Sequence, residues 1–256
     1  MTTTLALANQ KGGVAKTTSV ASLGAALAEL GQRVLLVDLD PQACLTFSLG
    51  IDPEDLELSV HHVLTKGLAT AEAVLATDDG VDLLPATIEL ARAEADLLTR
   101  TGREHVVKMA VEEVADDYDW VLLDCPPSLG VLTVAALTAA DGVLIPLQCE
   151  TLSHRGVGQL LDTVHDVRRF TNSRLEVWGV LPTMYDGRTN HAKAVLANIS
   201  ETYGLDIVDP PIPKSIRFAE APAAGRSVLS TTRRHKGAQA YRDVAANLLG
   251  RSRRAS

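Results

Sequence analysis

The stretch "NQKGGVAKTT" (residues 9–18) is a glycine-rich turn between a short apolar run and a segment with helical periodicity. Before it, "TLALA" (4–8) is β-prone, and after it apolar residues recur at spacings of three and four, which predicts a helix over 16–30. The next segment, "RVLLVDLD" (33–40), is a continuous apolar run that ends in aspartates. A strand, a turn, a helix and a second buried strand are typical of a parallel sheet.

The rest of the chain repeats this alternation. Buried strands are expected at four further apolar runs and at a weaker fifth: 81–86, 119–124, 142–147, 175–183 and 205–209. Helical patterns lie between them, at 59–76, 87–99, 103–116, 130–140, 153–171, 190–203 and 236–249. The sequence therefore predicts an α/β fold of the P-loop NTPase type, one domain over 1–250, with a mostly parallel twisted sheet and helices on both faces. The basic segment 251–256 is expected to be a disordered tail.

Composition limits the classes of function. The chain has 256 residues, of which 46% are hydrophobic and only 4% aromatic, which indicates a core of small aliphatic side chains. Neither a membrane span nor a signal-peptide pattern is visible, so we expect a cytoplasmic protein. Cys44, Cys125 and Cys149 are too widely spaced to suggest a disulfide framework or a zinc site. The net charge is −8, but residues 188–256 carry an excess of basic side chains, so one face can still bind a polyanion.

The glycine-rich turn has the properties of a phosphate-binding loop, although it departs twice from G-x-x-x-x-G-K-[ST]: Gln10 and Ala15 stand at the two glycine positions. Gly12–Gly13 let the backbone curl so that its N–H groups point inward, and the following helix adds its positive end. Lys16 can reach the β- and γ-phosphates, and the Thr17 hydroxyl can bind Mg²⁺. Taken alone, the loop could also be a strand-to-helix turn with a solvated lysine.

Three aspartates are expected beside this loop. Asp38 and Asp40 end one apolar run, and Asp124 ends another. The carboxyl ends of parallel strands meet at one edge of the sheet, where ligands bind, so these carboxylates would face the loop. There Asp124 could organise a metal across from Thr17. Each aspartate alone could be a helix cap or a turn former, but their convergence indicates a site for a nucleotide and magnesium.

The turn also holds two lysines, Lys11 and Lys16, where one phosphate chain usually needs one. Lys16 would serve the phosphates of its own subunit. Lys11 lies before the Gly-Gly turn, from where its side chain is poorly placed to reach the same oxygens. A second ammonium on one triphosphate makes sense if it comes from an opposite subunit, as an arginine finger does in trans. The alternative is a lysine that faces solvent at the entry of the loop.

Five segments resemble the ParA/Soj family of partition ATPases, within the deviant Walker A class that includes MinD: "NQKGGVAKTT", "VLLVDLDPQ", "LLDCPPSLGVLTVAAL", "IPLQCE" and "IPKSIRFAEAP". The likeness runs from about Thr4 to Leu249 with the same order and spacing. It implies an ATPase that uses ATP and Mg²⁺, forms a sandwich homodimer when bound to ATP, and binds nonspecific double-stranded DNA of the nucleoid. It further implies release from DNA when a ParB-like partner stimulates hydrolysis, without a role for a membrane.

The resemblance implies roles for individual residues. Catalytic roles fall to Lys11, which would cross the dimer interface, to Lys16, and to the switch carboxylate Asp40. The nucleotide would be held by Lys11, Gly12, Gly13, Val14, Ala15, Lys16, Thr17 and Thr18 around the phosphates, and by Met184, Pro211, Ile212 and Pro213 around the adenine. Magnesium would be held by Thr17, Asp38, Asp40 and Asp124. DNA would be contacted by Arg188, Lys214 and Arg217.

Ala15 departs from the family, which usually has glycine at this position. Its N–H faces the phosphates, so the added methyl group could narrow the loop or slow turnover. If the φ of Ala15 is negative and near-helical, alanine fits without strain and stiffens the loop. We expect ATP binding to be retained.

Other functions share parts of this sequence. A membrane-positioning ATPase of the MinD kind would need a basic amphipathic helix with bulky apolar residues, whereas "GAQAYRDVAANLLG" (237–250) shows an ordinary core stripe. A related ATPase that positions another cargo on the nucleoid, such as a microcompartment or a receptor cluster, can hardly be distinguished from a partition ATPase by these sequence features. A cluster-carrying reductase would need two loop cysteines that face each other across a dimer axis. The basic cluster "RRHK" (233–236) fits both a solvated helix entry and part of a DNA-binding face.

Overall fold

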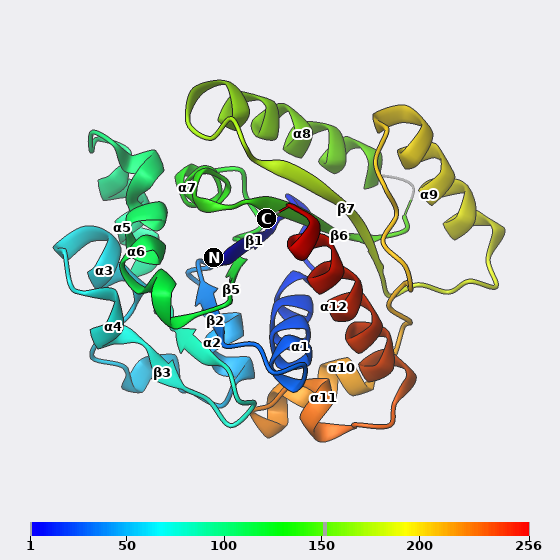
Figure 1. Ribbon diagram of the computed structural model, residues 1–256, viewed down its shortest axis with the longest axis horizontal. Coiled ribbons are helices and arrows are strands. Elements are labelled where there is room, and N and C mark those ends of the chain that lie inside the picture. Colours follow the sequence, from blue (N-terminus) through cyan, green and yellow to red (C-terminus); the bar gives the residue numbers. More distant parts are fainter. Residues whose placement is uncertain (1, 151–152, 256) are drawn as a thin grey trace.

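The computed structural model describes residues 2–150 and 153–255. Within these residues, seven strands form one sheet in the order β3-β4-β2-β5-β1-β6-β7 (Figure 1). The strands are β1 (Thr3–Leu7), β2 (Val34–Asp38), β3 (Leu75–Ala76), β4 (Asp82–Leu84), β5 (Trp120–Asp124), β6 (Gly142–Gln148) and β7 (Glu176–Thr183). Neighbouring strands are parallel, apart from the short β3, which is antiparallel to β4. The predicted mostly parallel sheet is confirmed.

Helices cover both faces of the sheet, as predicted (Figure 1). One face packs against α1 (Lys16–Glu29), α2 (Cys44–Ser48), α11 (Val228–Thr231) and α12 (Lys236–Ala255). The other face packs against α3 (Val60–Lys66), α5 (Leu90–Leu97), α6 (Val106–Val114), α7 (Val131–Ala139), α8 (Ser153–Phe170) and α9 (Asn190–Tyr203). The short helices α4 (Thr70–Ala73), α10 (Arg217–Glu220) and η4 (Ala221–Ala224, a 3₁₀ helix) lie between these elements. No helix in the described part of the chain is both long and apolar enough to span a membrane.

Two expected elements differ from the structure. The helix expected over 59–76 is split into α3, α4 and β3, because Gly67 adopts a left-handed conformation (φ 71°) that ends α3. The weak strand expected over 205–209 is reduced to a single bridge between Ile207 and Val180.

The end of the chain also differs from the expectation of a disordered tail over 251–256. The described part of this segment, through Ala255, continues α12. Arg251 holds the helix against the sheet, since its guanidinium lies 5.3 Å from the ring centre of Trp178 and donates a 2.8 Å hydrogen bond to the Trp178 carbonyl. A cation–π contact and a backbone hydrogen bond give this basic side chain a structural role.

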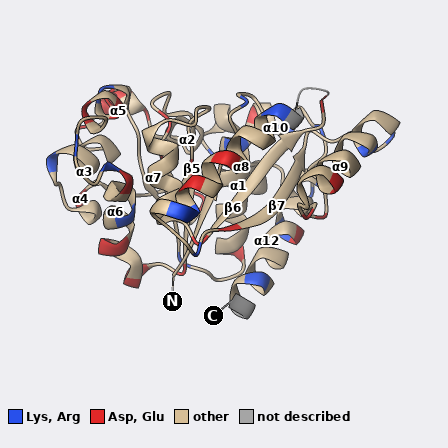
Figure 2. Ribbon diagram, turned by 90° about the horizontal axis from the view of Figure 1, so that it is seen from above, with Lys and Arg blue, Asp and Glu red and all other residues tan. Residues whose placement is uncertain are grey.

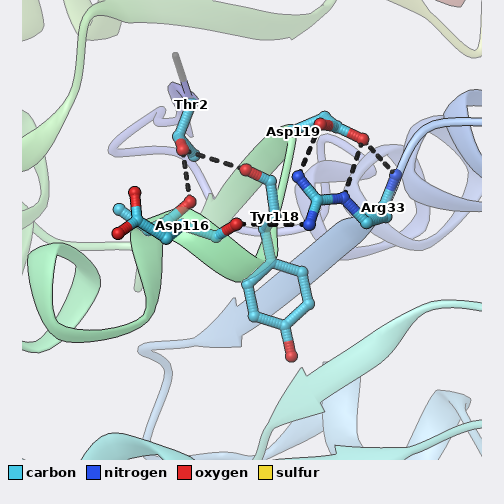
Figure 3. Close-up of polar contacts among 6 residues, drawn as sticks. Thr2, Arg33, Asp116, Tyr118 and Asp119 are labelled. Atoms are coloured by element: carbon cyan, nitrogen blue, oxygen red, sulfur yellow. Dashed lines mark hydrogen bonds and ion pairs between the residues drawn. The ribbon is translucent and has the colours of Figure 1, made fainter.

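The amino-terminal edge of the sheet is closed by a network of polar contacts (Figure 3). The Asp119 carboxylate accepts hydrogen bonds from the Arg33 backbone and guanidinium, each at 2.9 Å. Arg33 Nη1 also donates to the Asp116 carbonyl, and Thr2 Oγ1 donates to the Tyr118 carbonyl. These residues directly precede β1, β2 and β5, so the contacts tie the starts of three strands together.

Candidate nucleotide site

The phosphate-binding loop spans residues 8–15 between β1 and α1. Two side chains hold its shape, one from within the loop and one from β7. Asn9 accepts a hydrogen bond from Lys11 N (2.9 Å) and donates one to the Pro146 carbonyl (2.8 Å), while Thr183 Oγ1 donates to the Val14 carbonyl (2.9 Å). The loop is thereby fixed to the ends of β6 and β7. Sequence analysis assigned no role to Asn9 or Thr183, although Asn9 belongs to the motif.

The two lysines of the loop lie in different environments. Lys16 is 7% exposed, and its Nζ lies 3.5 Å from the Lys11 carbonyl, inside the curl of the loop. The Lys11 side chain is 37% exposed and pairs with the Glu150 carboxylate after β6. Lys16 is therefore positioned for phosphates bound in this loop, whereas the Lys11 ammonium points away from it.

Ala15 has a left-handed backbone, with φ 61° and ψ 34°. The condition under which alanine would fit without strain is therefore not met. Among the described residues, the non-glycine residues with positive φ are Ala15, Ala43 and Met184, and all three lie in loops at the carboxyl ends of the strands. A left-handed conformation costs a residue with a Cβ about 1–2 kcal/mol, and such strain is concentrated at functional sites.

Asp38 is fully buried, and both of its carboxylate oxygens accept hydrogen bonds. Oδ1 accepts from Asp40 N (3.1 Å), and Oδ2 accepts from Thr46 N (2.9 Å) and Thr46 Oγ1 (2.8 Å). Burial raises the pKa of Asp38 to about 6, although these hydrogen bonds lower it in part. Asp38 thus holds Asp40 and α2 in place, and Thr46 is a third residue to which sequence analysis assigned no role.

Asp124 is equally buried, but neither of its carboxylate oxygens has a hydrogen-bond partner within the described residues. Burial raises the pKa of Asp124 well above its usual range, and the neighbouring Asp38 raises it further. Thr17 and Lys16 lie close enough to lower that pKa in part, although no hydrogen bond of standard geometry reaches the carboxylate from the part of the chain that the structure describes. Two buried oxygens without donors, beside a threonine hydroxyl, fit a hard cation such as magnesium.

Asp40 is partly exposed at the mouth of the site, where its Oδ1 accepts a hydrogen bond from Gln42 N (3.0 Å). It lies next to the buried pair and is open to solvent, unlike Asp38. This places it where it can meet a bound water or a phosphate. Thr17 and Thr18, in the first turn of α1, are also partly exposed.

The residues predicted to surround the adenine come together in the structure. Tyr185 N donates to the Ile212 carbonyl (2.9 Å), and Ile212 N donates to the Pro182 carbonyl (2.8 Å). These bonds place Met184 beside 211–213, at the same edge of the sheet as the phosphate loop.

The predicted DNA-contacting residues are exposed, and both arginines are paired with neighbouring carboxylates. The Arg188 side chain is 90% exposed and binds Asp186 through two hydrogen bonds of 2.9 Å, which together with nearby Lys214 lower the pKa of Asp186 to about 2. Arg217 lies in α10 (Figure 2) and donates a 2.7 Å hydrogen bond to Glu220 of the same helix. The cluster 233–236 lies at the start of α12, where the Arg233 carbonyl accepts a hydrogen bond from Arg242.

The parallel sheet, the loop between β1 and α1 and the buried Asp124 define a P-loop nucleoside triphosphatase. A family model described as "AAA domain" matches residues 2–177. The chain is 43% identical over 242 residues to the sporulation initiation inhibitor protein Soj of Bacillus subtilis, covering 94% of this chain and 96% of that protein. It is 41% identical over 252 residues to the chromosome partitioning protein ParA of Caulobacter vibrioides, covering 97% and 94%. A crystal structure from Mycobacterium smegmatis with ADP and magnesium, named cobyrinic acid a,c-diamide synthase, has 54% identity, a TM-score of 0.88 and coverage of 97% and 94%.

The chain belongs to the ParA/Soj family of partition ATPases. It is an ATPase that uses ATP and Mg²⁺. The loop with Lys16 fits the phosphates, and Thr17 with Asp124 fits the metal. Magnesium held there would neutralise part of the charge of the phosphates.

Proposed function

We propose that this ATPase forms a sandwich dimer when bound to ATP, binds nonspecific double-stranded DNA in that state, and leaves the DNA when a ParB-like partner stimulates hydrolysis. Its place in the cell would be the cytoplasm, on the nucleoid. The named relatives from Bacillus subtilis and Caulobacter vibrioides support this choice, since one is a chromosome partitioning protein.

The observation that carries the proposal is the separation of the two loop lysines. Lys16 is buried in the loop, whereas the Lys11 ammonium is directed outward to Glu150. An exposed ammonium that leaves its own phosphate site can act on a nucleotide in a second subunit. An ion pair between exposed groups is worth only about 0–1 kcal/mol, so the Lys11–Glu150 pair opposes this exchange weakly.

Arg188, Lys214 and Arg217 support the DNA-binding part of the proposal. Arg188 follows β7, and Lys214 and Arg217 follow the segment 211–213 that is proposed to surround the adenine. Their positive charges would therefore lie on one surface, beside the nucleotide site. Phosphate contacts carry no sequence information, which suits nonspecific binding. The carboxylates of Asp186 and Glu220 would compete with DNA phosphates and keep the binding reversible.

The packing of α12 favours DNA over a membrane as the surface that this ATPase uses. Tyr241, Val244, Ala245 and Leu248 form the apolar stripe of the helix, and all are buried against the sheet and α1. A helix that binds a membrane must present its apolar face to lipid. The stripe could do so only by leaving the core. Binding to anionic vesicles that depends on ATP would contradict this choice.

A second candidate is amide formation on a corrinoid acid, because the relative with 54% identity carries the name of a diamide synthase. A synthase that takes its nitrogen from glutamine needs a thiolate nucleophile. Desolvation raises the pKa of the buried Cys125, that of the half-buried Cys149 to about 11, and that of Cys44, which is exposed and whose pKa the nearby aspartates raise further. A raised pKa makes a thiol a poor nucleophile at neutral pH. We therefore prefer the partition function.

The test is binding to duplex DNA of arbitrary sequence with ATP, with ADP and without nucleotide, over a salt series. We expect the protein to bind DNA with ATP but not with ADP or without nucleotide, and we expect its DNA affinity to fall as the salt concentration rises. Arg188→Glu and Arg217→Glu should each reduce DNA affinity and leave ATP-dependent dimerisation intact. Arg103→Glu is the control, since the Arg103 side chain is 40% exposed and is paired with a neighbouring glutamate, as Arg217 is.

Two results would contradict the proposal. One is a parent protein whose DNA affinity is the same with ATP and ADP. The other is nucleotide-dependent amide formation on a corrinoid acid supplied with glutamine or ammonia, which would establish the second candidate instead.

A further inference from the structure

Two glycines bring α2 and η4 into direct backbone contact. Gly50 follows α2 with φ 82°, and Gly225 follows η4 with φ 64°. A Cβ atom on Gly225 would lie 2.7 Å from Gly50 Cα, and a Cβ on Gly50 would lie 3.1 Å from the Gly225 carbonyl oxygen. No side chain fits between the two backbones without moving one of them.

On the Gly50 side, the contact leads directly to the nucleotide site. Thr46 ties α2 to the buried Asp38 through two hydrogen bonds, and Asp38 also binds the backbone of Asp40. The end of α2 is closed by hydrogen bonds from Gly50 N to the Phe47 carbonyl and from Ile51 N to the Thr46 carbonyl. A shift at the Asp38–Asp40 segment therefore moves α2 and Gly50 as one body.

On the Gly225 side, the contact leads to Arg217. The segment after Gly225 is anchored, because Asp79 binds both Ser227 N and Ser230 Oγ. The segment before it, η4 and α10, is continuous with Arg217. A displacement of Gly225 would therefore move η4 and α10, which carry the predicted DNA contact Arg217, and leave the anchored segment after Gly225 in place.

Segment 217–225 is also tied to α1, by a second route. The Phe218 ring lies edge-on to Tyr241, with ring centres 5.8 Å apart. Tyr241 is fully buried, and its hydroxyl shares a 2.9 Å hydrogen bond with Ser19 in α1. Segment 217–225 is thus linked to α1 indirectly, through Phe218 and Tyr241 of α12, and it touches the end of α2 through the contact of Gly225 with Gly50.

We propose that Gly50 and Gly225 are positioning residues that transmit the nucleotide state of the Asp38–Asp40 segment to Arg217 and so set DNA affinity. The inference rests on the proposed DNA binding. It adds a route within one subunit, so that DNA affinity depends on this contact as well as on dimer formation. By linkage, DNA must change nucleotide affinity through the same contact and by the same factor.

The test compares glycine-to-alanine variants matched in backbone strain. Gly225 and Gly204 both have φ 64°, but a Cβ on Gly204, at the end of α9, meets no atom of the described residues within 4 Å. Both substitutions impose the same left-handed strain, and only Gly225→Ala forces Gly50 away. We measure DNA affinity with ATP and with ADP, together with ATP-dependent dimerisation.

In Gly225→Ala, the ratio of DNA affinity with ATP to that with ADP should fall by roughly tenfold, within the usual range of coupling between sites. Dimerisation should be unchanged, and Gly204→Ala should keep the parent ratio. A purely structural role would lower DNA affinity in both nucleotide states and preserve the ratio, which would overturn the inference.

A second matched pair keeps the test open if Gly225→Ala does not fold. Gly50→Ala, with φ 82° and the milder 3.1 Å approach, is compared with Gly31→Ala, with φ 79° and open space around the Cβ. The same fall in the ratio is expected for Gly50→Ala alone. If the parent itself shows no nucleotide-dependent DNA binding, the proposed function fails; if the parent does and both test variants match their controls, only the inference fails.

Discussion

The two edges of the sheet treat their polar groups in opposite ways. At the amino-terminal edge, Arg33 and Asp119 are hydrogen-bonded to each other, and the Thr2 hydroxyl donates to the Tyr118 carbonyl (Figure 3). At the carboxyl edge, Asp124 is buried without a partner among the described residues, and Ala15 has a strained backbone. The hydrogen bonds at the amino-terminal edge stabilise the fold, whereas the polar groups at the carboxyl edge are available to bind a ligand. Substitutions should therefore separate stability from function according to the edge on which they lie.

The largest expected effect comes from Lys11→Ala at the carboxyl edge. The variant should bind ATP as a monomer but lose dimerisation and hydrolysis together, with a fall in the hydrolysis rate of roughly 10³-fold, as for loss of a cation acting in trans. Its Tm should stay near that of the parent, because the side chain is exposed and its ion pair is weak. Lys16→Ala should instead weaken nucleotide binding itself. Hydrolysis at the parent rate in Lys11→Ala would end the idea of a lysine acting across the interface.

Asp124→Asn should make the apoprotein more stable, by about 1–2 kcal/mol, because it removes a buried carboxylate that lacks a hydrogen-bond donor of good geometry among the described residues. The measurement is urea unfolding with EDTA, followed by the shift in Tm on adding ATP and magnesium, which the variant should lose. Asp38→Asn is the matched control and should destabilise, since both Asp38 oxygens accept hydrogen bonds. A loss of stability in Asp124→Asn would show that this carboxylate has partners in solution.

Ala15→Gly should stabilise the protein by roughly 0.5–1 kcal/mol, since relief of the left-handed strain outweighs the added flexibility of the unfolded chain. If the methyl group also crowds the phosphates, ATP turnover should rise. Thermal unfolding and steady-state hydrolysis give the two answers separately. An unchanged or lower turnover with higher stability would mean that the loop is adapted to alanine.

The smallest effect is expected at the amino-terminal edge, from Asp119→Asn. It should lower Tm slightly and leave ATP affinity and hydrolysis unchanged, because the pair with Arg33 lies on the far side of the sheet. Arg33 holds the pKa of Asp119 below its usual value. The pair therefore contributes fully above the ordinary carboxyl pKa of about 3.9 and is lost as pH falls toward the lowered value. In acid, the difference in Tm between parent and variant should shrink. A changed rate of hydrolysis at neutral pH would contradict the view that the amino-terminal edge contributes to stability and not to function.

The sequence predicted the sheet and the residues that gather at its carboxyl edge, but not the hydrogen bonding and backbone conformation of each of these residues. Continuous apolar runs marked the long strands because those strands are covered on both faces. The different states of Asp38 and Asp124 could not be predicted, because they depend on Thr46 folding back onto only one of them. The left-handed backbone conformation of Ala15 could not be predicted either, because the local sequence indicates neither its φ nor the hydrogen bond by which Thr183 anchors the loop.

The strand order has a consequence for how the protein is made. β1 leaves the ribosome first, but its partners β5 and β6 are translated more than one hundred residues later, with Thr3 beside Trp120 and Leu5 beside Gly142. Until then the nascent chain carries an aliphatic segment without a sheet to join, a state open to chaperones and to aggregation. The phosphate loop directly follows β1, and Asn9 within it is hydrogen-bonded to Pro146 in β6. We therefore expect ribosome-bound chains to retain nucleotide only after β6 has emerged.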